Sequence, residues 1–262
     1  MRRRLSAFLI ALALIAAPRP VFAAWAIDVA WSSSFNAGAG INTSFTYGSA
    51  VAAGATLICF VTGNHATQGI VTGASDDVNG GAWTKFGPTV NSGGLALALT
   101  AWYFPNSAAG TPTVTATFTL SVSARSMACG SYTGLATSST FDVGAGQGQT
   151  NPGTASNAIS TGATAATAQA NELAVAYTMV QNGTTITAGT TLAWTQRLNT
   201  SVGATYQLQV EDFNVASPAT VTATWTINNA GGDTMSIVGT FKEPSAGGGC
   251  TGGFLLLGVG KC

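Results

Sequence analysis

The stretch Thr113–Thr119 reads TVTATFT, and about a hundred residues later Thr220–Thr226 reads TVTATWT. Both stretches alternate apolar residues with threonine. Strict alternation with a period of two is typical of a β-strand that has one buried and one wet face, and threonine favours the extended conformation. The stretches therefore predict two equivalent strands, and in the first of them Val114, Ala116 and Phe118 share the buried face.

A longer correspondence runs in the same order around this pair. A repeat of about a hundred residues suits a duplicated sheet layer or a duplicated domain. We expect two sequence-related halves, at about residues 27–135 and 141–243. The matching segments are Ile27–Val29 with Phe141–Val143, Leu57–Val61 with Leu173–Tyr177, Ala82–Thr84 with Ala193–Thr195, and Gly130–Tyr132 with Gly239–Phe241.

The pattern between these segments predicts an all-β fold. Clusters of Gly, Asn, Asp and Ser separate the apolar runs, and no window keeps a helical period. Leu57–Val61 and Leu173–Tyr177 are apolar on both faces, as central strands are. We predict an antiparallel β-sandwich, jelly-roll or Ig-like, built from the two halves. Because no evident linker divides them, one continuous double-layer sandwich is favoured over two tandem sandwiches.

Residues 1–23 predict a signal peptide. Arg2–Arg4 form a basic start, Leu5–Ala17 an apolar run, and Val21–Ala23 a small-x-small cleavage pattern. We expect cleavage after Ala23 or one residue later. A membrane anchor is the alternative, although the run is short for a bilayer span and two prolines follow it. Nothing later approaches a spanning length, so we expect a secreted, extracellular or cell-surface protein.

The charge balance excludes nucleic acid as a partner. The chain has nine Lys and Arg and nine Asp and Glu, but four of the arginines lie in the first 19 residues. The exported part would keep five basic residues against nine acidic ones, without the basic clusters that phosphates require. Abundant Thr, Ser, Ala and Gly favour an exported β-protein over a cytosolic enzyme.

Four motifs follow one another along the chain. An apolar strand follows the turn Ala53–Leu57, and then come the pair Trp83-Thr84, the A-G-T-x-T-V-T-x-T-F pattern of Ala109–Phe118, and the Y-x-G-L pattern of Tyr132–Leu135. In these motifs the chain resembles a broad group of uncharacterised exported bacterial and phage-associated β-sandwich proteins. Ala55-Thr56 departs from the acidic turn residue of that group. The resemblance implies a surface or particle-associated role and no established activity.

Four cysteines in an exported chain predict two disulfides. When the halves are aligned on their matching segments, Cys59 falls opposite Val175 and Cys129 opposite Val238. Both cysteines thus replace core valines of the other half, and we expect them to form a bridge. The alternative is a pair of buried free thiols, because unpaired cysteine packs as a small hydrophobe.

The last residues, 244–262, predict a Gly-rich linker and a tail bounded by Cys250 and Cys262, which then pair with each other. Its apolar run either docks on the sandwich or contacts another surface, and we treat this run as a possible binding site. The run consists of Phe254, Leu255, Leu256 and Leu257.

An aromatic pair marks a difference between the halves. Leu95–Phe104 is apolar on both faces, whereas its counterpart at Ala204–Glu211 alternates and should be exposed on one side. Trp102 and Phe104 could therefore lie under a loop or against the other half, or could form an exposed patch for a ligand or partner. We favour the covered position and keep the patch as a binding hypothesis.

Oxygen ligands gather at Asp76, Asp77 and Asn79, which a calcium ion would favour, although such runs more often form turns. We expect no other cofactor. The sole histidine, His65, lies in a turn without a nucleophile motif. Glu211 and Asp212 are adjacent in a strand, so they point to opposite faces and cannot act together as a glycosidase pair.

These observations predict a protein that is not an enzyme. We expect a secreted or cell-surface β-sandwich for attachment, adhesion or assembly, whose partner is a surface protein, a particle or a glycan. A carbohydrate-binding module, with or without calcium, is the alternative, and a hydrolase is the third.

Overall fold

The structure, a computed structural model, describes residues 24–64, 71–92, 97–181, 185–203, 205–228 and 232–244. They belong to one compact unit that begins at Ala24. The described residues form strands and turns without a helix, so the all-β prediction is confirmed. In this part of the chain no helix is long and apolar enough to cross a membrane.

The first half forms a large and a small antiparallel sheet. The large sheet has the order β1-β9-β4-β7-β6, with β2 also paired to β9, and the small sheet has the order β3-β8-β5. The strands are β1 (Ala26–Ile27), β2 (Ser32–Asn36), β3 (Gly40–Thr46), β4 (Thr56–Asn64), β5 (Val71–Asp76), β6 (Thr84–Asn91), β7 (Leu97–Phe104), β8 (Thr113–Val122) and β9 (Ala124–Thr133).

The second half repeats this strand order. Its large sheet is β10-β17-β12-β15-β14, and its small sheet is β11-β16-β13. That the halves derive from one duplicated sequence stays a prediction. The strands are β10 (Phe141–Gln149), β11 (Ile159–Ser160), β12 (Glu172–Gln181), β13 (Ile186–Ala188), β14 (Thr195–Val202), β15 (Tyr206–Val215), β16 (Thr224–Ile227) and β17 (Thr234–Phe241).

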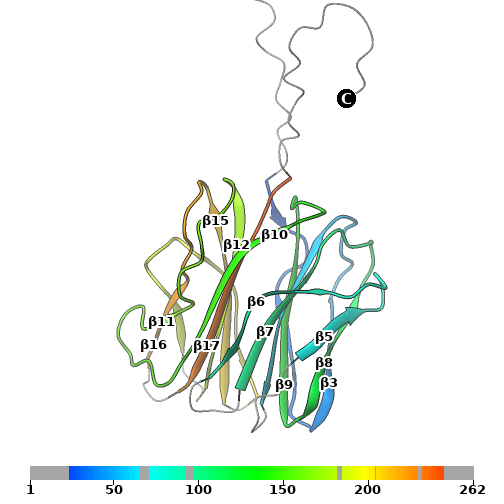
Figure 1. The fold of residues 1–262 in the computed structure, drawn as a ribbon. Coiled ribbons are helices and arrows are strands. Elements are labelled where there is room, and N and C mark those ends of the chain that lie inside the picture. The colour runs from blue at the N-terminus through cyan, green and yellow to red at the C-terminus, as the bar shows by residue number, and fades with distance from the viewer. Residues whose placement is uncertain are drawn as a thin grey trace, which may run out of the picture. The chain divides into compact units, whose positions relative to one another are not determined.

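The four sheets stack as four layers, small, large, large and small, which Figure 1 shows from β11 and β16 on one side to β3 and β8 on the other. One hydrophobic core fills each half between its own two sheets. A third core lies between the two large sheets, where Phe60 stacks on Tyr177 with ring centroids 4.9 Å apart. The molecule is therefore two sandwiches joined by a buried seam.

This arrangement corrects the expectation of one double-layer sandwich. Strands β4 and β12 are apolar on both faces because each has two cores to fill. Ile58 and Val175 face the seam, while the next residues along the chain, Cys59 and Ala176, face the small sheets. Two sandwiches without a linker are stable here because they share the seam.

The bridge between Cys59 and Cys129 is confirmed. The two residues are direct partners across β4 and β9, and their sulfurs are bonded. The equivalence with Val175 was wrong by one residue, because Val238 pairs with Ala176 and Val175 pairs with Gly239. A slip of one residue reverses the face on which a strand residue lies, so Cys59 occupies the position of Ala176.

Alternating glycines let β10 lie close to β6 of the other half. A Cβ on Gly146 would lie 2.5 Å from Val90 Cγ2, and a Cβ on Gly148 would lie 1.9 Å from the carbonyl oxygen of Asn91. No side chain fits at either position. The GAGQGQ run of Gly144–Gln149 is therefore a packing signal for the seam.

The expectation that β15 is exposed on one side was also wrong. Gln209 and Glu211 are fully buried between the sheets of the second half. Polar side chains satisfy them in part: Asn199 Nδ2 donates to Gln209 Oε1 at 3.3 Å, and Gln209 Nε2 donates to Glu211 Oε2 at 3.3 Å. The polar alternation along β15 thus reflects an internal amide network instead of a solvent-facing side.

Candidate functional site

The outer face of the small sheet β3-β8-β5 is covered with short hydroxyl and amide side chains. Its three strands contain one charged residue, Asp76, which is buried. We call this surface the hydroxyl face. Its members are Asn42, Ser44 and Thr46 of β3, Thr113, Thr115 and Thr117 of β8, and Ser75 of β5.

Strand pairing arranges the hydroxyl groups of this face in regular rows. Ser44 and Thr115 are direct partners whose hydroxyl oxygens lie 3.1 Å apart, and the hydroxyl oxygens of Thr46 and Thr113 are also 3.1 Å apart. Rows on one strand repeat about every 6.8 Å, and neighbouring strands are about 4.8 Å apart. The sheet therefore presents hydroxyl groups at regular intervals, and the inward residues of the same strands pack into the first core.

Two open depressions flank the hydroxyl face. One is lined by Ser34, Phe35, Asn36, Asn42, Thr43 and Ser44, between β2 and β3. The other is lined by Ser75, Asp76, Asp77, Thr113 and Thr115. Phe35 is 37% exposed, but its ring lies on the opposite face of β2 from Ser34 and Asn36, against Gly203 of the second half.

A buried arginine holds the turn between β2 and β3. Arg125 Nη1 donates to the carbonyl oxygen of Asn42 at 2.6 Å, and Nη2 donates to that of Gly38. The side chain is 4% exposed and packs so closely on Gly40 that a Cβ there would meet Nη1 at 2.1 Å. Arg125 thus positions the edge of the hydroxyl face beside Asn42.

One threonine of the matching stretch in the second half is covered. Thr224 lies at the repeat position of Thr117, but only 6% of it is exposed. Its hydroxyl donates to Asn157 Oδ1 at 3.0 Å and lies 2.8 Å from Thr191 Oγ1. Thr117 has no such cover and is exposed. At this position the threonine is therefore open in the first half and covered in the second.

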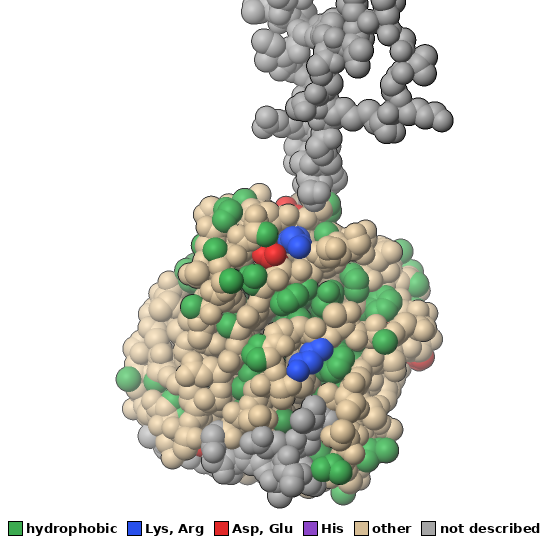
Figure 2. Space-filling model, viewed as in Figure 1, with side chains coloured by type: hydrophobic (Ala, Val, Ile, Leu, Met, Phe, Trp, Pro, Cys, Tyr) green, Lys and Arg blue, Asp and Glu red, His purple; other side chains and the backbone are tan. Residues whose placement is uncertain are grey.

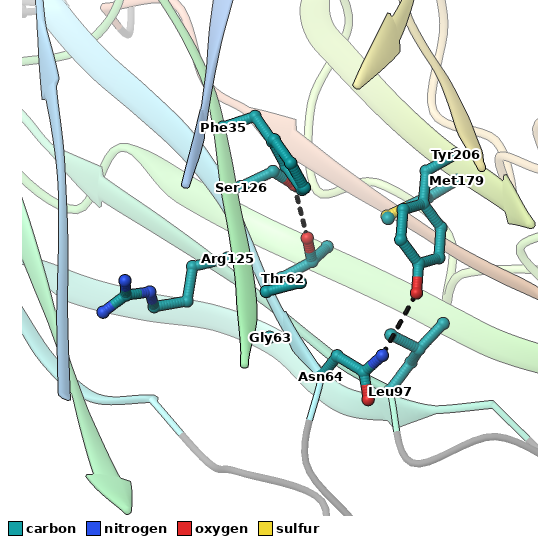
Figure 3. A pocket seen from close by; sticks show the side chains of 10 residues that line it. Phe35, Thr62, Gly63, Asn64, Leu97, Arg125, Ser126, Met179 and Tyr206 are labelled. Carbon is teal, nitrogen blue, oxygen red and sulfur yellow. Dashed lines mark hydrogen bonds between the residues drawn. The ribbon is translucent and has the colours of Figure 1, made fainter. Parts of the chain in front are cut away.

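A small pocket lies at the seam, beside the end of β4 and the start of β9 (Figure 3). Asn64 Nδ2 donates to the Tyr206 hydroxyl at 3.1 Å, and the hydroxyls of Thr62 and Ser126 lie 2.5 Å apart. Figure 3 shows Arg125 pointing away from Tyr206. Because its polar groups bond to one another, this pocket joins the halves.

Charges on the described surface are few and scattered over the face that Figure 2 shows, apart from a basic and an acidic side chain that lie side by side near the top. A buried set lies in the seam. Arg197 Nε donates to Asp212 Oδ2 at 2.6 Å, and the Tyr132 hydroxyl donates to the same oxygen at 3.0 Å. Burial and the Asp212 charge raise the pKa of Tyr132 well above its usual value of 10.0. Tyr132 is therefore a neutral donor that ties the first half to the second.

Glu211 lies on the opposite face of β15 from Asp212, as predicted. Burial raises the pKa of Glu211 to about 8. Trp225 Nε1 lies close enough to lower this pKa slightly, but neither Trp225 Nε1 nor Glu211 Oε1 makes a hydrogen bond of normal geometry. A protonated carboxyl group in the core of the second half follows from this burial.

The predicted calcium ligands form a turn before β6. Asp76 Oδ1 accepts from the backbone N–H groups of Val78 and Asn79 at 2.8 and 2.7 Å, and Asp76 Oδ2 accepts from Trp83 Nε1 at 2.8 Å. Burial alone would raise the pKa of Asp76, but these hydrogen bonds lower it below 3.8.

Asp77 and Asn79 also bond to the chain. Asp77 Oδ1 accepts from Thr113 N at 2.7 Å, and Asn79 Oδ1 accepts from Ala108 N at 2.8 Å. Within the described ranges no three His, Cys, Asp or Glu residues gather as a metal site. Calcium binding stays a prediction. The observed hydrogen bonds account for this run as a turn.

The aromatic pair is mostly covered, by the small sheet of its own half. Trp102 is 6% exposed inside the first core, so it belongs to no exposed patch. Phe104 is half-buried and packs beside Trp83 with ring centroids 6.3 Å apart. The seam is lined instead by the alternate residues of β7, such as Leu99 and Tyr103.

Several predicted residues lie outside the described part of the chain. They are His65, Cys250, Cys262, Phe254, Leu255, Leu256 and Leu257. Comparison of the chain with protein-family models, with curated proteins and with solved structures gives no match.

Proposed function

We propose that the protein is an exported, non-catalytic attachment protein that binds its partner through the hydroxyl face. One observation carries the proposal: Thr117 is exposed, whereas Thr224 at the repeat position is covered by Asn157 and Thr191. The second half shows that this fold can cover the threonine at this position with its own loops. The open surface of the first half is then the part that is free to contact another molecule.

The disulfide in the first core supports export. The bond between Cys59 and Cys129 is typical of proteins that fold in an oxidising compartment. Together with the signal-like residues 1–23, it favours a secreted or cell-surface protein.

The second candidate is a carbohydrate-binding module. The depression beside β3 favours it, because the amides of Asn36 and Asn42 and the hydroxyls of Ser34 and Ser44 lie there. Sugars present hydroxyl groups that pair with such amides and hydroxyls. In this case the attachment partner is a neutral glycan.

Lysine substitutions test the contact surface. Thr117→Lys places a long charged side chain on the central strand of the hydroxyl face, and we expect binding to cells or particles to fall at least tenfold. Thr187→Lys is the matched control, because Thr187 is an exposed threonine on the small sheet of the other half. If both variants keep their melting temperature and bind like the parent, the hydroxyl face is not the contact.

A glycan array separates the two candidates. Binding to neutral glycans that Asn42→Ala abolishes would support the carbohydrate-binding module, and loss of that binding with a chelator would support calcium. Binding to cells that persists after glycan removal would support a protein or particle partner.

A further inference from the structure

Trp25 holds the start of the folded chain against both halves. Its backbone N–H donates to Glu243 Oε1 at 3.2 Å, and its indole Nε1 donates to Asn214 Oδ1 at 3.3 Å. Its ring meets Tyr132 edge-on, with ring centroids 5.8 Å apart. β1 begins at the next residue. Trp25 is therefore an integral part of the fold, and Ala24 before it is exposed.

Glu243 is half-buried and faces no cation among the described residues. Each described basic side chain is bound elsewhere. Lys85 bonds to Thr89, Arg125 to two carbonyl oxygens, Arg197 to Asp212, and Lys242 to Asp142. On the neighbouring elements, Glu172, Asp142 and Asp212 are acidic. A positive group that reached Glu243 would therefore meet a carboxylate that lacks a partner charge.

We infer that export processing cleaves the bond between Ala23 and Ala24, and that the α-ammonium group created on Ala24 binds the Glu243 carboxylate. The inference rests on the export in the proposed function. In this step water adds across the peptide bond. The C–N bond breaks, Ala23 gains a carboxylate and Ala24 gains the ammonium group. A signal peptidase would supply the catalysis.

The position of the cut follows from the cleavage pattern. Cleavage after Ala24 would place the bulky Phe22 at the third residue before the cut, where a small residue is required, whereas cleavage after Ala23 places Val21 there. Trp25 N donates to Glu243 Oε1 in the folded chain. The Ala24 nitrogen is one residue away, so it can reach the second carboxylate oxygen.

The pairing would join the first residue of one half to the segment after β17 of the other. A nearby carboxylate favours the charged form of an amine, so it raises the pKa of the α-amino group above its usual range of about 7.7–8.0. Glu243→Gln should return the pKa to that range.

Two measurements test the inference separately. The first is the intact mass of the exported protein, which we expect to begin at Ala24. Export with a different first residue would overturn the inference and leave the proposed function standing. Failure of export would overturn the proposed function together with the cleavage.

The second measurement uses a chain made without export, with Met placed before Ala24 so that methionine aminopeptidase removes it. We expect an α-amino pKa at least half a unit higher than in Glu243→Gln. A chain extended by Gly-Ser before Ala24 is the control, and its pKa should be the same with Glu243 or with Gln. Equal pKa values in the unextended pair would overturn the Glu243 site whatever the export result.

Discussion

Replacing Glu211 with glutamine should remove a large part of the pH dependence of folding. Glu211 is fully buried, and burial raises its pKa from 4.5 to about 8. Between these values the folded protein binds a proton that the unfolded chain has lost. The free energy of unfolding therefore falls as pH rises from about 4.5 to about 8, and changes little for this group beyond that range.

The shift sets the size of the effect. Each pKa unit corresponds to roughly 1.4 kcal/mol, so the full loss is on the order of 5 kcal/mol. Glutamine has nearly the same shape and keeps an acceptor for Gln209 Nε2, but it carries no charge at any pH. We expect Glu211→Gln to match the parent near pH 5 and to be more stable by several kcal/mol at pH 9.

Urea unfolding at pH 5, 7 and 9 measures this directly, with the disulfide intact. Burial also raises the pKa of Glu172, but that residue is present in both proteins, so the difference between the two curves isolates Glu211. If parent and variant lose the same stability between pH 5 and 9, Glu211 is not protonated in the folded state and the argument from burial is wrong.

Three further predictions concern the scaffold. In the double variant Cys59→Ala/Cys129→Ala the free energy of unfolding should fall by about 4 kcal/mol, because the bridge closes a loop with a sequence separation of 70 residues. A fall below about 1 kcal/mol in urea unfolding would contradict this. Gly148→Ala should lower the free energy of unfolding by about 3 kcal/mol, because the added methyl group overpacks the seam. Gly73→Ala should be neutral, because a Cβ there meets nothing within 4 Å. Equal melting temperatures of the two variants would refute the packing argument. Asp76→Asn should cost about 1–2 kcal/mol at pH 7 and should reduce the stability lost as pH falls below 3.8, which acid unfolding monitors; an unchanged acid midpoint would speak against it.

The candidate site shows where sequence reasoning stops. The alternation in Thr113–Thr119 predicts a threonine face, and that face exists. The same alternation occurs in Thr220–Thr226, so the pattern alone cannot tell an open face from a covered one. Asn157 decides the difference, because it reaches Thr224 from a loop 67 residues away in the chain.

The polar residues of β15 led in the same way to a wrong prediction of an exposed face. Gln209 and Glu211 indicate a wet face when only the strand is considered, since a buried charge is costly. The amide of Asn199 on β14 makes burial of Gln209 acceptable, and protonation does so for Glu211. Partners of this kind come from other strands, so strand periodicity does not contain them.

The sequence by itself determined the all-β class, the strand faces of Thr113–Thr119 and the pairing of Cys59 with Cys129. Each depends on period-two patterning or on cysteine chemistry, which act locally or through few partners. Of Thr220–Thr226, only residues 224–226 lie in a strand, and Thr224 is buried. Tertiary structure alone decided that there are four layers, that Gly146 and Gly148 leave room for β6 to pack closely, and that one threonine face is open. These features depend on which surfaces meet across the seam and which loops fold over a sheet. Side chains distant in sequence set such contacts, and no single segment encodes them.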